Sequence, residues 1–384
     1  MRVDDPRDDV PAQRPPHRRS RRARRAAGPL LATAAACAIA LTIIPSGFVI
    51  EQPGPVFDTL GEVTDADGAQ VPLIRVDGAT TYPTSGSLDL LTVQVVGSPE
   101  TRPNATDLAA AWLDPRRAIV PVDAVFPQGE SSDRRDEVNA ALMVDSQQEA
   151  AAAAFAYLGE PVSASVTVRA VAEGSPAAGA LVPGDAIEAV DGEPVADAEQ
   201  VRSVVDAARG EPVIVTVTRD GALLSVSVTP EQDAGGAWLL GITVQAEYVT
   251  PYPVVFALPG VGGPSAGMMF ALAIVDLLTP GALTGGEAVA GTGTISADGE
   301  VGPIGGIRQK MWGARDAGAA YFLAPLANCD EVAGHAPDGL RVIAVSTLDE
   351  AVEALGSVAA DGGSDLPGCP PDIAVAGHSP SPAS

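Results

Sequence analysis

The chain has 384 residues, of which 46% are hydrophobic and 19% are charged, and its formal net charge is −26. This length allows two or three domains with ample core, and the acidic balance argues against nucleic-acid binding, because the folded part keeps no basic stripe to neutralise phosphates. The three histidines and three cysteines lack metal-ligand spacing, so we expect neither a metal nor a cofactor.

The N-terminal region combines a basic cluster with a long apolar run. Arginines concentrated in residues 18–25 lead into an uncharged stretch from Gly28 to Ile50. As a helix this stretch is about 34 Å long, enough for a hydrocarbon core of about 30 Å. The positive-inside rule makes residues 1–27 a cytoplasmic tail, residues 28–50 a transmembrane helix, and the remainder extracytoplasmic. A cleaved signal peptide is the alternative, because small residues around 34–40 offer a cleavage site.

Strand-like and helix-like runs follow the apolar stretch. Short strands are expected in 70–78 and 88–97, and helices in 109–114 and 145–159. Asp145 is the expected N-cap of the second helix, and Gly159 its C-terminal stop.

Residues 161–231 form a compact module with a different pattern. An alternating strand, a strand framed by turns and an amphipathic helix precede a hairpin about Asp220-Gly221. The run GSPAAGALVPGDAIEAVDG, residues 174–192, resembles a PDZ domain of the kind associated with bacterial proteases. The resemblance implies a groove between the second strand, near 166–171, and the helix at 196–208, where a polypeptide end adds as a further strand. A spacer or lid is the alternative role.

A single serine stands where a glycine-rich turn meets a strongly apolar run, in GVGGPSAGMMFALAIVDLL, residues 260–278. On local pattern alone Ser265 is the N-cap of a helix, because serine is a favoured capping residue. The only lysine of the chain, Lys310, favours another interpretation. A desolvated lysine can lose its proton and activate a serine hydroxyl, whereas arginine stays charged. The alternative for Lys310 is a remnant on a helix surface.

Two motifs in order resemble the proteolytic domain of the Lon family. GGPSAG matches its nucleophile motif, and GTGTISADGEVGPIGGIRQK matches the stretch that ends in its catalytic lysine. The resemblance implies Ser265 as nucleophile, Lys310 as general base and Thr292 as a hydroxyl that orients the lysine amine. Backbone N–H groups near Gly263 and Ser265 are candidates for binding the oxyanion. The family has an aspartate three positions before the serine, where this chain has Gly262.

The resemblance also implies an architecture. We expect an α+β fold in which the PDZ-like β-rich module interrupts a peptidase domain made of residues 56–158 and 236–358, after one transmembrane helix. The tail from 359 to 384, rich in Gly, Pro and Ser, is expected to be disordered. Cys329 and Cys369 are the candidates for a disulfide in the exported part, and about 4 kcal/mol of stabilisation is expected from it in the chain-entropy model.

These features predict an ATP-independent, membrane-anchored serine endopeptidase that cleaves exported or membrane polypeptides recruited by the PDZ-like groove. The sequence has no G-x-x-x-x-G-K-[ST] motif, and with one lysine, followed by Met311, it can have none. An oligomer is compatible with this prediction. Two alternatives are a catalytically silent peptide-binding scaffold at the membrane and a hydrolase that uses His335 as its base.

Overall fold

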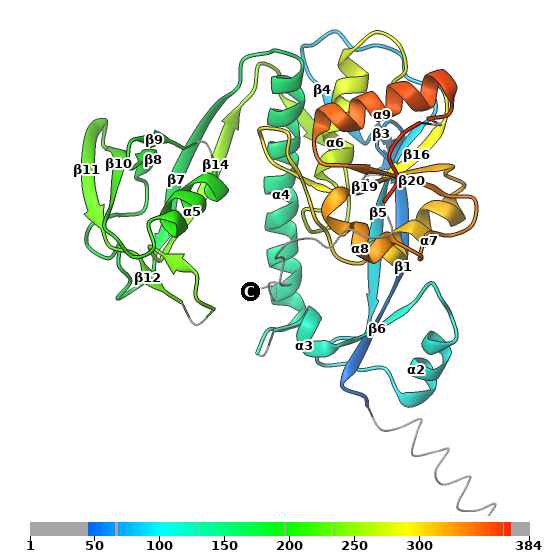
Figure 1. The fold of residues 1–384 in the computed structure, drawn as a ribbon, viewed down its shortest axis with the longest axis horizontal. Helices are drawn as coiled ribbons and strands as arrows, with labels where there is room; N and C mark the ends of the chain where they lie inside the picture. The colour runs from blue at the N-terminus through cyan, green and yellow to red at the C-terminus, as the bar shows by residue number, and fades with distance from the viewer. Residues whose placement is uncertain are drawn as a thin grey trace, which may run out of the picture.

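The computed structural model describes residues 45–65, 68–127, 129–195, 197–233, 235–363 and 365–369. A larger domain and a smaller domain lie on either side of one long helix, α4 (Ser132–Tyr157) (Figure 1). The smaller domain is inserted into the larger one, since the chain leaves the larger domain after α4 and returns to it after residue 249.

The larger domain is built on a mixed six-stranded sheet with the order β20-β19-β16-β5-β1-β6. The strands β5, β16, β19 and β20 run parallel, whereas β1 is antiparallel to both of its neighbours. Strands from the start and the end of the chain therefore share one sheet, as a split domain requires. The strands are β1 (Phe48–Asp58), β5 (Ser87–Val96), β6 (Ala118–Pro121), β16 (Ala288–Gly291), β19 (Tyr321–Pro325) and β20 (Arg341–Val345).

Helices cover both faces of this sheet. Leu90 of β5 packs into a core with α4, α6 (Gly267–Leu278) and α9 (Leu348–Asp361). The next residue, Leu91, packs into a second core with α7 (Ile307–Ala317) and α8 (Cys329–Val332). This alternation follows from the two-residue period of a strand, so the larger domain has three layers.

The long helix α4 begins earlier than the sequence predicts. Its N-cap is Ser131, whose hydroxyl accepts the backbone N–H of Arg134, and Asp145 lies in the helix interior. The prediction of Asp145 as N-cap is therefore wrong, because the charged first half of α4 carries no apolar periodicity that would reveal a helix. The stop is confirmed, since α4 ends at Tyr157 and Gly159 adopts a φ of +74°.

The smaller domain has a sheet with the order β11-β10-β8-β7-β14, and β9 pairs with β8. The hairpin turn is confirmed, because Asp220 and Gly221 both have positive φ between β10 and β11. The strand β14 lies inside the predicted catalytic segment 236–358 but pairs with β7, so that boundary is wrong and the smaller domain continues to Val249. Its elements are β7 (Ser163–Val171), β8 (Ala186–Val190), β9 (Glu193–Pro194), α5 (Ala198–Ala207), β10 (Val213–Arg219), β11 (Ala222–Val228) and β14 (Ile242–Val249).

Short elements complete the chain. Most are two- to four-residue strands and single turns that connect the layers. They are β2 (Glu62–Thr64), β3 (Gln70–Pro72), β4 (Ile74–Val76), α2 (Ala105–Trp112), α3 (Val122–Val125), β12 (Glu231–Gln232), β13 (Trp238–Leu239), β15 (Val254–Phe256), β17 (Thr294–Ile295), β18 (Val301–Gly302) and η1 (Leu326–Asn328).

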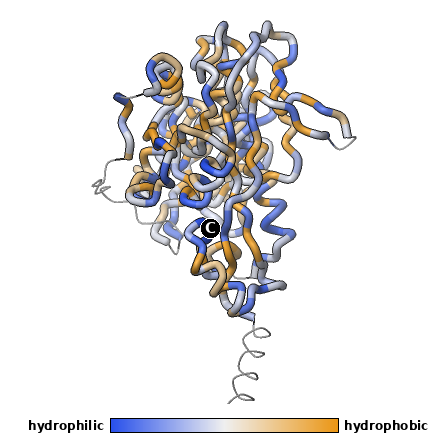
Figure 2. The backbone as a smooth tube through the Cα atoms, turned by 90° about the vertical axis from the view of Figure 1, so that its right-hand side faces the viewer, coloured by the Kyte–Doolittle hydropathy of each residue, from blue (hydrophilic) through white to orange (hydrophobic). Residues whose placement is uncertain are grey.

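The predicted transmembrane segment 28–50 is wrong at its C-terminal end. Phe48, Val49 and Ile50 are the first residues of β1, and the latter two are buried in the larger domain. Residues 28–44 lie outside the described part of the chain, and within the described part no helix has the length and apolar character needed to span a bilayer. Hydrophobic stretches are instead distributed among hydrophilic ones through the body of the molecule (Figure 2). Hydropathy alone cannot separate the end of a membrane span from a buried strand that follows it.

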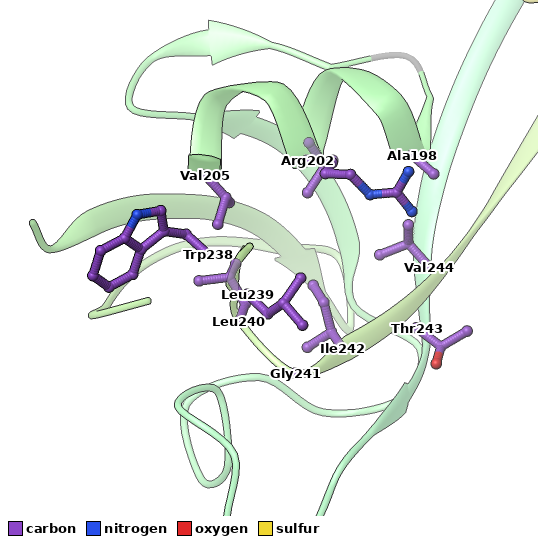
Figure 3. Close-up of a pocket in the computed structure, with 11 residues that line it drawn as sticks. Ala198, Arg202, Val205, Trp238, Leu239, Leu240, Gly241, Ile242, Thr243 and Val244 are labelled. Carbon is purple, nitrogen blue, oxygen red and sulfur yellow. The ribbon is translucent and has the colours of Figure 1, made fainter. Parts of the chain in front are cut away.

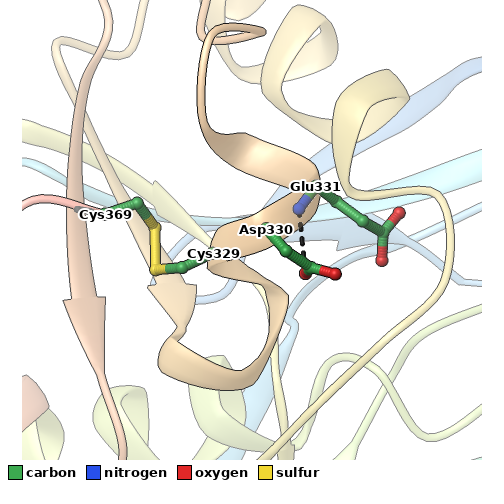
Figure 4. The surroundings of a disulfide bond; sticks show 4 residues. All are labelled: Cys329, Asp330, Glu331 and Cys369. Carbon is green, nitrogen blue, oxygen red and sulfur yellow. Dashed lines mark hydrogen bonds between the residues drawn. A yellow bond between two sulfur atoms is a disulfide. The ribbon is translucent and has the colours of Figure 1, made fainter. Parts of the chain in front are cut away.

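A disulfide ties the C-terminal segment to the larger domain. Cys329 at the start of α8 is bonded to Cys369 (Figure 4). The segment before Cys369 is ordered, because Leu366 packs on the core and the carbonyl of Pro367 accepts the N–H of Ala344 at 3.1 Å. The predicted disorder from 359 onward is therefore wrong as far as Cys369, and residues 370–384 lie outside the described part.

Candidate active site

Ser265 does not cap the helix that follows it. The N-cap position of α6 belongs to Ala266, which offers no side-chain acceptor. The hydroxyl of Ser265 lies instead 2.6 Å from the Nζ atom of Lys310. The capping interpretation is therefore wrong, and the serine side chain is available for chemistry.

Lys310 reaches the serine from the first turns of α7. That helix starts after Gly306, which adopts a left-handed conformation with a φ of +68°. The Lys310 side chain is only 3% exposed. Its Nζ also donates to Oγ1 of Thr292 at 2.8 Å, and the Thr292 hydroxyl donates to the carbonyl oxygen of Ser265 at 2.9 Å. The structure thus brings the three predicted residues together in one hydrogen-bonded group.

Burial is the dominant electrostatic influence on this lysine. Desolvation lowers the pKa of Lys310 to about 7, because an apolar environment disfavours the charged ammonium. Near neutral pH the neutral amine is therefore well populated. In that state the amine has a free lone pair that can accept the proton of the Ser265 hydroxyl.

The turn that carries Ser265 is held from two sides. The N–H of Gly293 donates to the carbonyl of Ser265 at 2.9 Å, which fixes the turn against the segment after β16. From the other side, the buried hydroxyl of Ser146 on α4 donates to the carbonyl of Pro264 at 2.9 Å. A Cβ at Gly267 would lie 2.8 Å from the Ser146 hydroxyl, so this helix contact requires glycine. Sequence reasoning missed Ser146, which sits among polar and alanine residues with no distinguishing pattern.

The two glycines before the serine contact α4 and allow it to pack closely against the turn. The N–H of Gly263 donates to the carbonyl of Asn139 at 2.8 Å, so in this conformation it does not point to an oxyanion as predicted. A Cβ at Gly262 would lie only 2.8 Å from the Cβ of Asn139. Close approach of α4 therefore leaves no room for the aspartate that the Lon pattern has at this position.

The serine and the lysine open onto a mostly apolar cleft. Its volume is about 560 Å³, and most of the residues that line it are apolar, including Phe57, Met143 and Val261. Thr92 and Gln94 of β5 add polar groups beside Ser265 and Lys310. The alternative base, His335, is exposed in the turn after α8, where its Nδ1 lies 2.9 Å from the carbonyl of Ala333. The geometry thus favours the lysine over the histidine as the partner of Ser265.

The groove of the smaller domain lies elsewhere than predicted. β14 pairs with β7 along Ser163–Val171, and β8 pairs with its other edge at Val166 and Thr167, so the segment 166–171 is not the strand that borders the groove. A cavity of about 310 Å³ lies instead between α5 and residues 238–244. In Figure 3, Arg202 and Val205 of α5 face this segment across the cavity, and Trp238 stands at one end. The predicted groove strand, near 166–171, was therefore wrong. β14 pairs alongside β7, and the first residues of β14 border the cavity in its place.

No grouping of three or more His, Cys, Asp or Glu side chains that could hold a metal ion occurs within the described residues.

Comparison with known proteins identifies both units. Residues 257–356 match the family model for the Lon protease (S16) C-terminal proteolytic domain, and residues 167–219 match a PDZ domain model. The chain thus contains a Lon-type serine peptidase domain and a PDZ domain. These matches cover the turn at Ser265, the helix α7 that carries Lys310, and the core of the smaller sheet.

Individual relatives share only part of their length with this chain. Lon protease 1 of Bacillus subtilis is 39% identical over 94 residues, which is 24% of this chain and 12% of that protein. Lon protease 2 of Herpetosiphon aurantiacus is 40% identical over 91 residues, 23% of this chain and 11% of that protein. Among solved structures, the PDZ domain of an SdrC-like protein from Listeria innocua is 25% identical, covers 21% of this chain and 93% of its own, and has a TM-score of 0.20. The chain therefore spans about an eighth of the first of these relatives.

Proposed function

We propose that this protein is an ATP-independent, membrane-attached serine endopeptidase in which Ser265 is the nucleophile and Lys310 the general base. The observation that carries the proposal is the 2.6 Å contact between the Lys310 amine and the Ser265 hydroxyl. Burial lowers the pKa of this lysine to about 7, so its neutral form is available near neutral pH. A hydroxyl paired with a buried neutral amine is a recognised way to activate serine without histidine.

The reaction follows from this geometry. The Lys310 amine takes the proton of the Ser265 hydroxyl while Oγ attacks the scissile carbonyl carbon. The resulting ammonium then gives that proton to the departing amine, which leaves an ester on Ser265. The same amine then takes a proton from water while the water oxygen attacks the carbonyl carbon of the ester. The bond between that carbon and Oγ breaks, the Lys310 ammonium returns the proton to Oγ, and the carboxylic acid leaves with Ser265 and the neutral amine restored. Thr292 holds the amine in line throughout, since it joins Nζ to the backbone of the nucleophile.

The cleft fits an extended polypeptide. A larger hollow beside the serine is lined by the second half of β5, by Met143 of α4 and by the glycine turn at 260–262. Because β16 pairs with β5 only along 87–90, the part of β5 from Leu91 onward has one edge free of that partner. An unfolded chain can lie along this edge, whereas the sequence has no nucleotide-binding loop to drive the unfolding of a folded one.

The PDZ domain supplies a second surface that can bind the same substrate polypeptide. The strand β14 is the outermost strand of its sheet, and the cavity lies between its first residues and α5. A peptide end can therefore add beside β14 and place its side chains against Val201 and Val205. Recruitment at this groove would raise the local concentration of substrate near the cleft.

Membrane attachment is proposed from the sequence before the described part. The uncharged residues 28–44 follow a basic cluster, and 17 residues in a helix span about 26 Å, near the lower limit for crossing a bilayer. The basic side is expected in the cytoplasm, which places the peptidase domain on the extracytoplasmic side of the cell membrane. The disulfide between Cys329 and Cys369 agrees with an oxidising location.

The test is digestion of an unfolded protein by the full chain in detergent, without ATP, beside the variants Ser265→Ala and Lys310→Arg. The arginine variant keeps the positive charge and removes only the ability to accept a proton. We expect both variants to fold and to lose at least roughly 10⁴-fold of the activity. Cleavage by Lys310→Arg would assign the base to another residue, and an inactive parent protein would favour the scaffold function.

A further inference from the structure

Two adjacent apolar side chains at the end of α2 project into solvent. Trp112 is 80% exposed and Leu113 is 76% exposed, more than any other large hydrophobic residue in the described part of the chain. Single exposed apolar residues are ordinary on protein surfaces. A tryptophan and a leucine side by side, each almost fully exposed, are a candidate contact surface.

This surface lies next to the place where the described chain begins. Pro45 forms a β-bridge with Asn104, the N-cap of α2, and the N–H of Ser46 donates to the carbonyl of Pro103 at 3.0 Å. The eight residues of α2 extend about 12 Å from this contact to Trp112. Figure 1 places α2 and the start of β1 at the same end of the molecule, away from the PDZ domain.

The chain that precedes Pro45 indicates what covers this surface. Residues 28–44 are uncharged and apolar, and they join the larger domain beside α2. If this segment enters a bilayer, the lipid surface lies within reach of Trp112 and Leu113. Tryptophan is enriched at membrane interfaces, because its ring is apolar and its indole N–H can remain in the polar layer.

The charges around the pair predict a mainly apolar contact. The two arginines that follow are already paired with carboxylates, Arg116 with Asp114 at 3.0 Å and with Asp316 at 3.7 Å, and Arg117 with Asp114 at 3.5 Å. Asp107 on the same helix is occupied in the capping box with Asn104. Attraction to anionic headgroups is therefore expected to contribute little, and neutral lipid should suffice.

We propose that Trp112 and Leu113 insert into the membrane surface beside the N-terminal segment, so that the peptidase domain rests on the bilayer through two contacts and not through a single tether. This inference depends on the membrane attachment proposed above. A second contact restrains rotation about the tether and sets the height of the cleft above the lipid.

The test uses the full chain in phosphatidylcholine vesicles whose acyl chains carry bromine, a short-range quencher of tryptophan fluorescence. Trp112 is one of three tryptophans, so we expect quenching of roughly one third of the emission. The quenched part should disappear in Trp112→Phe and persist in the matched variant Trp238→Phe. Adding phosphatidylglycerol should not increase it.

The other outcomes separate the two proposals. If the protein does not float with the vesicles after an alkaline wash, membrane attachment fails and this contact fails with it. If it floats but Trp112 is not quenched, attachment stands and the docking surface is overturned. In that case, protection of Trp112 from aqueous acrylamide would assign the surface to a second protein, whereas accessibility would leave it solvated. Leu113→Ser should reduce the quenching, whereas Leu223→Ser on the exposed strand β11 should not.

Discussion

The cleft of the peptidase domain and the groove of the PDZ domain are built on different physical principles. The cleft depends on three polar residues, Ser265, Thr292 and Lys310, of which the last two are buried. Lys310 contacts the Ser265 hydroxyl and the Thr292 hydroxyl, and Thr292 donates to the Ser265 carbonyl oxygen. The groove depends on an outer strand and apolar side chains from α5. The first site is specified by individual atoms and is sensitive to single substitutions, whereas the second is specified by backbone and shape.

The largest expected difference between the two sites is their response to pH. Burial lowers the pKa of Lys310 to about 7, so at acidic pH the amine is protonated and cannot serve as the proposed base. Cleavage at saturating peptide should rise with pH through 7, and at pH 5 it should be about 100-fold slower than at pH 9. Initial rates on a short fluorogenic peptide measure this. A flat profile would contradict a lysine base, and peptide binding to the groove should stay constant over the same range.

Thr292 is expected to give the next largest effect. Thr292→Val keeps the shape but removes the bond to the Lys310 amine and the bond to the Ser265 carbonyl. We expect kcat to fall roughly 10- to 100-fold with little change in KM, because the base loses its alignment. Thr292→Ser keeps the hydroxyl and should recover most of the rate. Equal losses in both variants, with equal melting temperatures, would argue against a positioning role.

Filling the PDZ groove should affect only long substrates. Ala198 lines the groove at the start of α5, and Ala198→Phe would occupy the space between that helix and β14. KM for an unfolded protein should rise roughly tenfold or more, whereas a short peptide should be cleaved at the parental rate. Ala222→Phe, on the exposed strand β11, is the matched control. A parental KM for Ala198→Phe would indicate a spacer or lid.

The smallest expected effect is on the pH dependence of stability, through Glu149 on the side of α4 that faces the PDZ domain. Burial, with Asp145 and then Asp197 nearby, raises the pKa of Glu149 on α4 to about 7. The folded state therefore holds a proton that the unfolded chain releases near pH 4.5, and stability is lost as the pH rises from there through 7. Glu149→Gln should weaken this dependence of stability on pH. The change in melting temperature between pH 5 and pH 8 should differ from that of the parent by about a few degrees at most. Calorimetry at pH 5 and pH 8 measures the difference, and identical slopes in both proteins would contradict it.

Where chemistry or a turn fixes the residue type, the sequence pointed to residues that the structure places as expected, with Lys310 beside Ser265 and a hairpin turn at Asp220-Gly221. The single lysine in an arginine-rich chain pointed to Lys310, and Asp220-Gly221 pointed to a hairpin. Prediction from sequence failed where two structures share one local pattern. The run at 242–249 alternates like any strand, and only its pairing with β7 assigns it to the PDZ domain. The residues Phe48–Ile50 are apolar whether they end a membrane helix or begin β1.

The sequence by itself determined the composition of the site, namely a serine in a glycine turn, a unique lysine 45 positions later and a threonine between them. Tertiary structure decided that these side chains meet, that the lysine is buried enough to lose its charge, and that α4 approaches so closely that Gly262 cannot be an aspartate. Distances and desolvation depend on elements far apart in the chain. No local pattern encodes them, because each arises only when α4, α6 and α7 pack around the same turn.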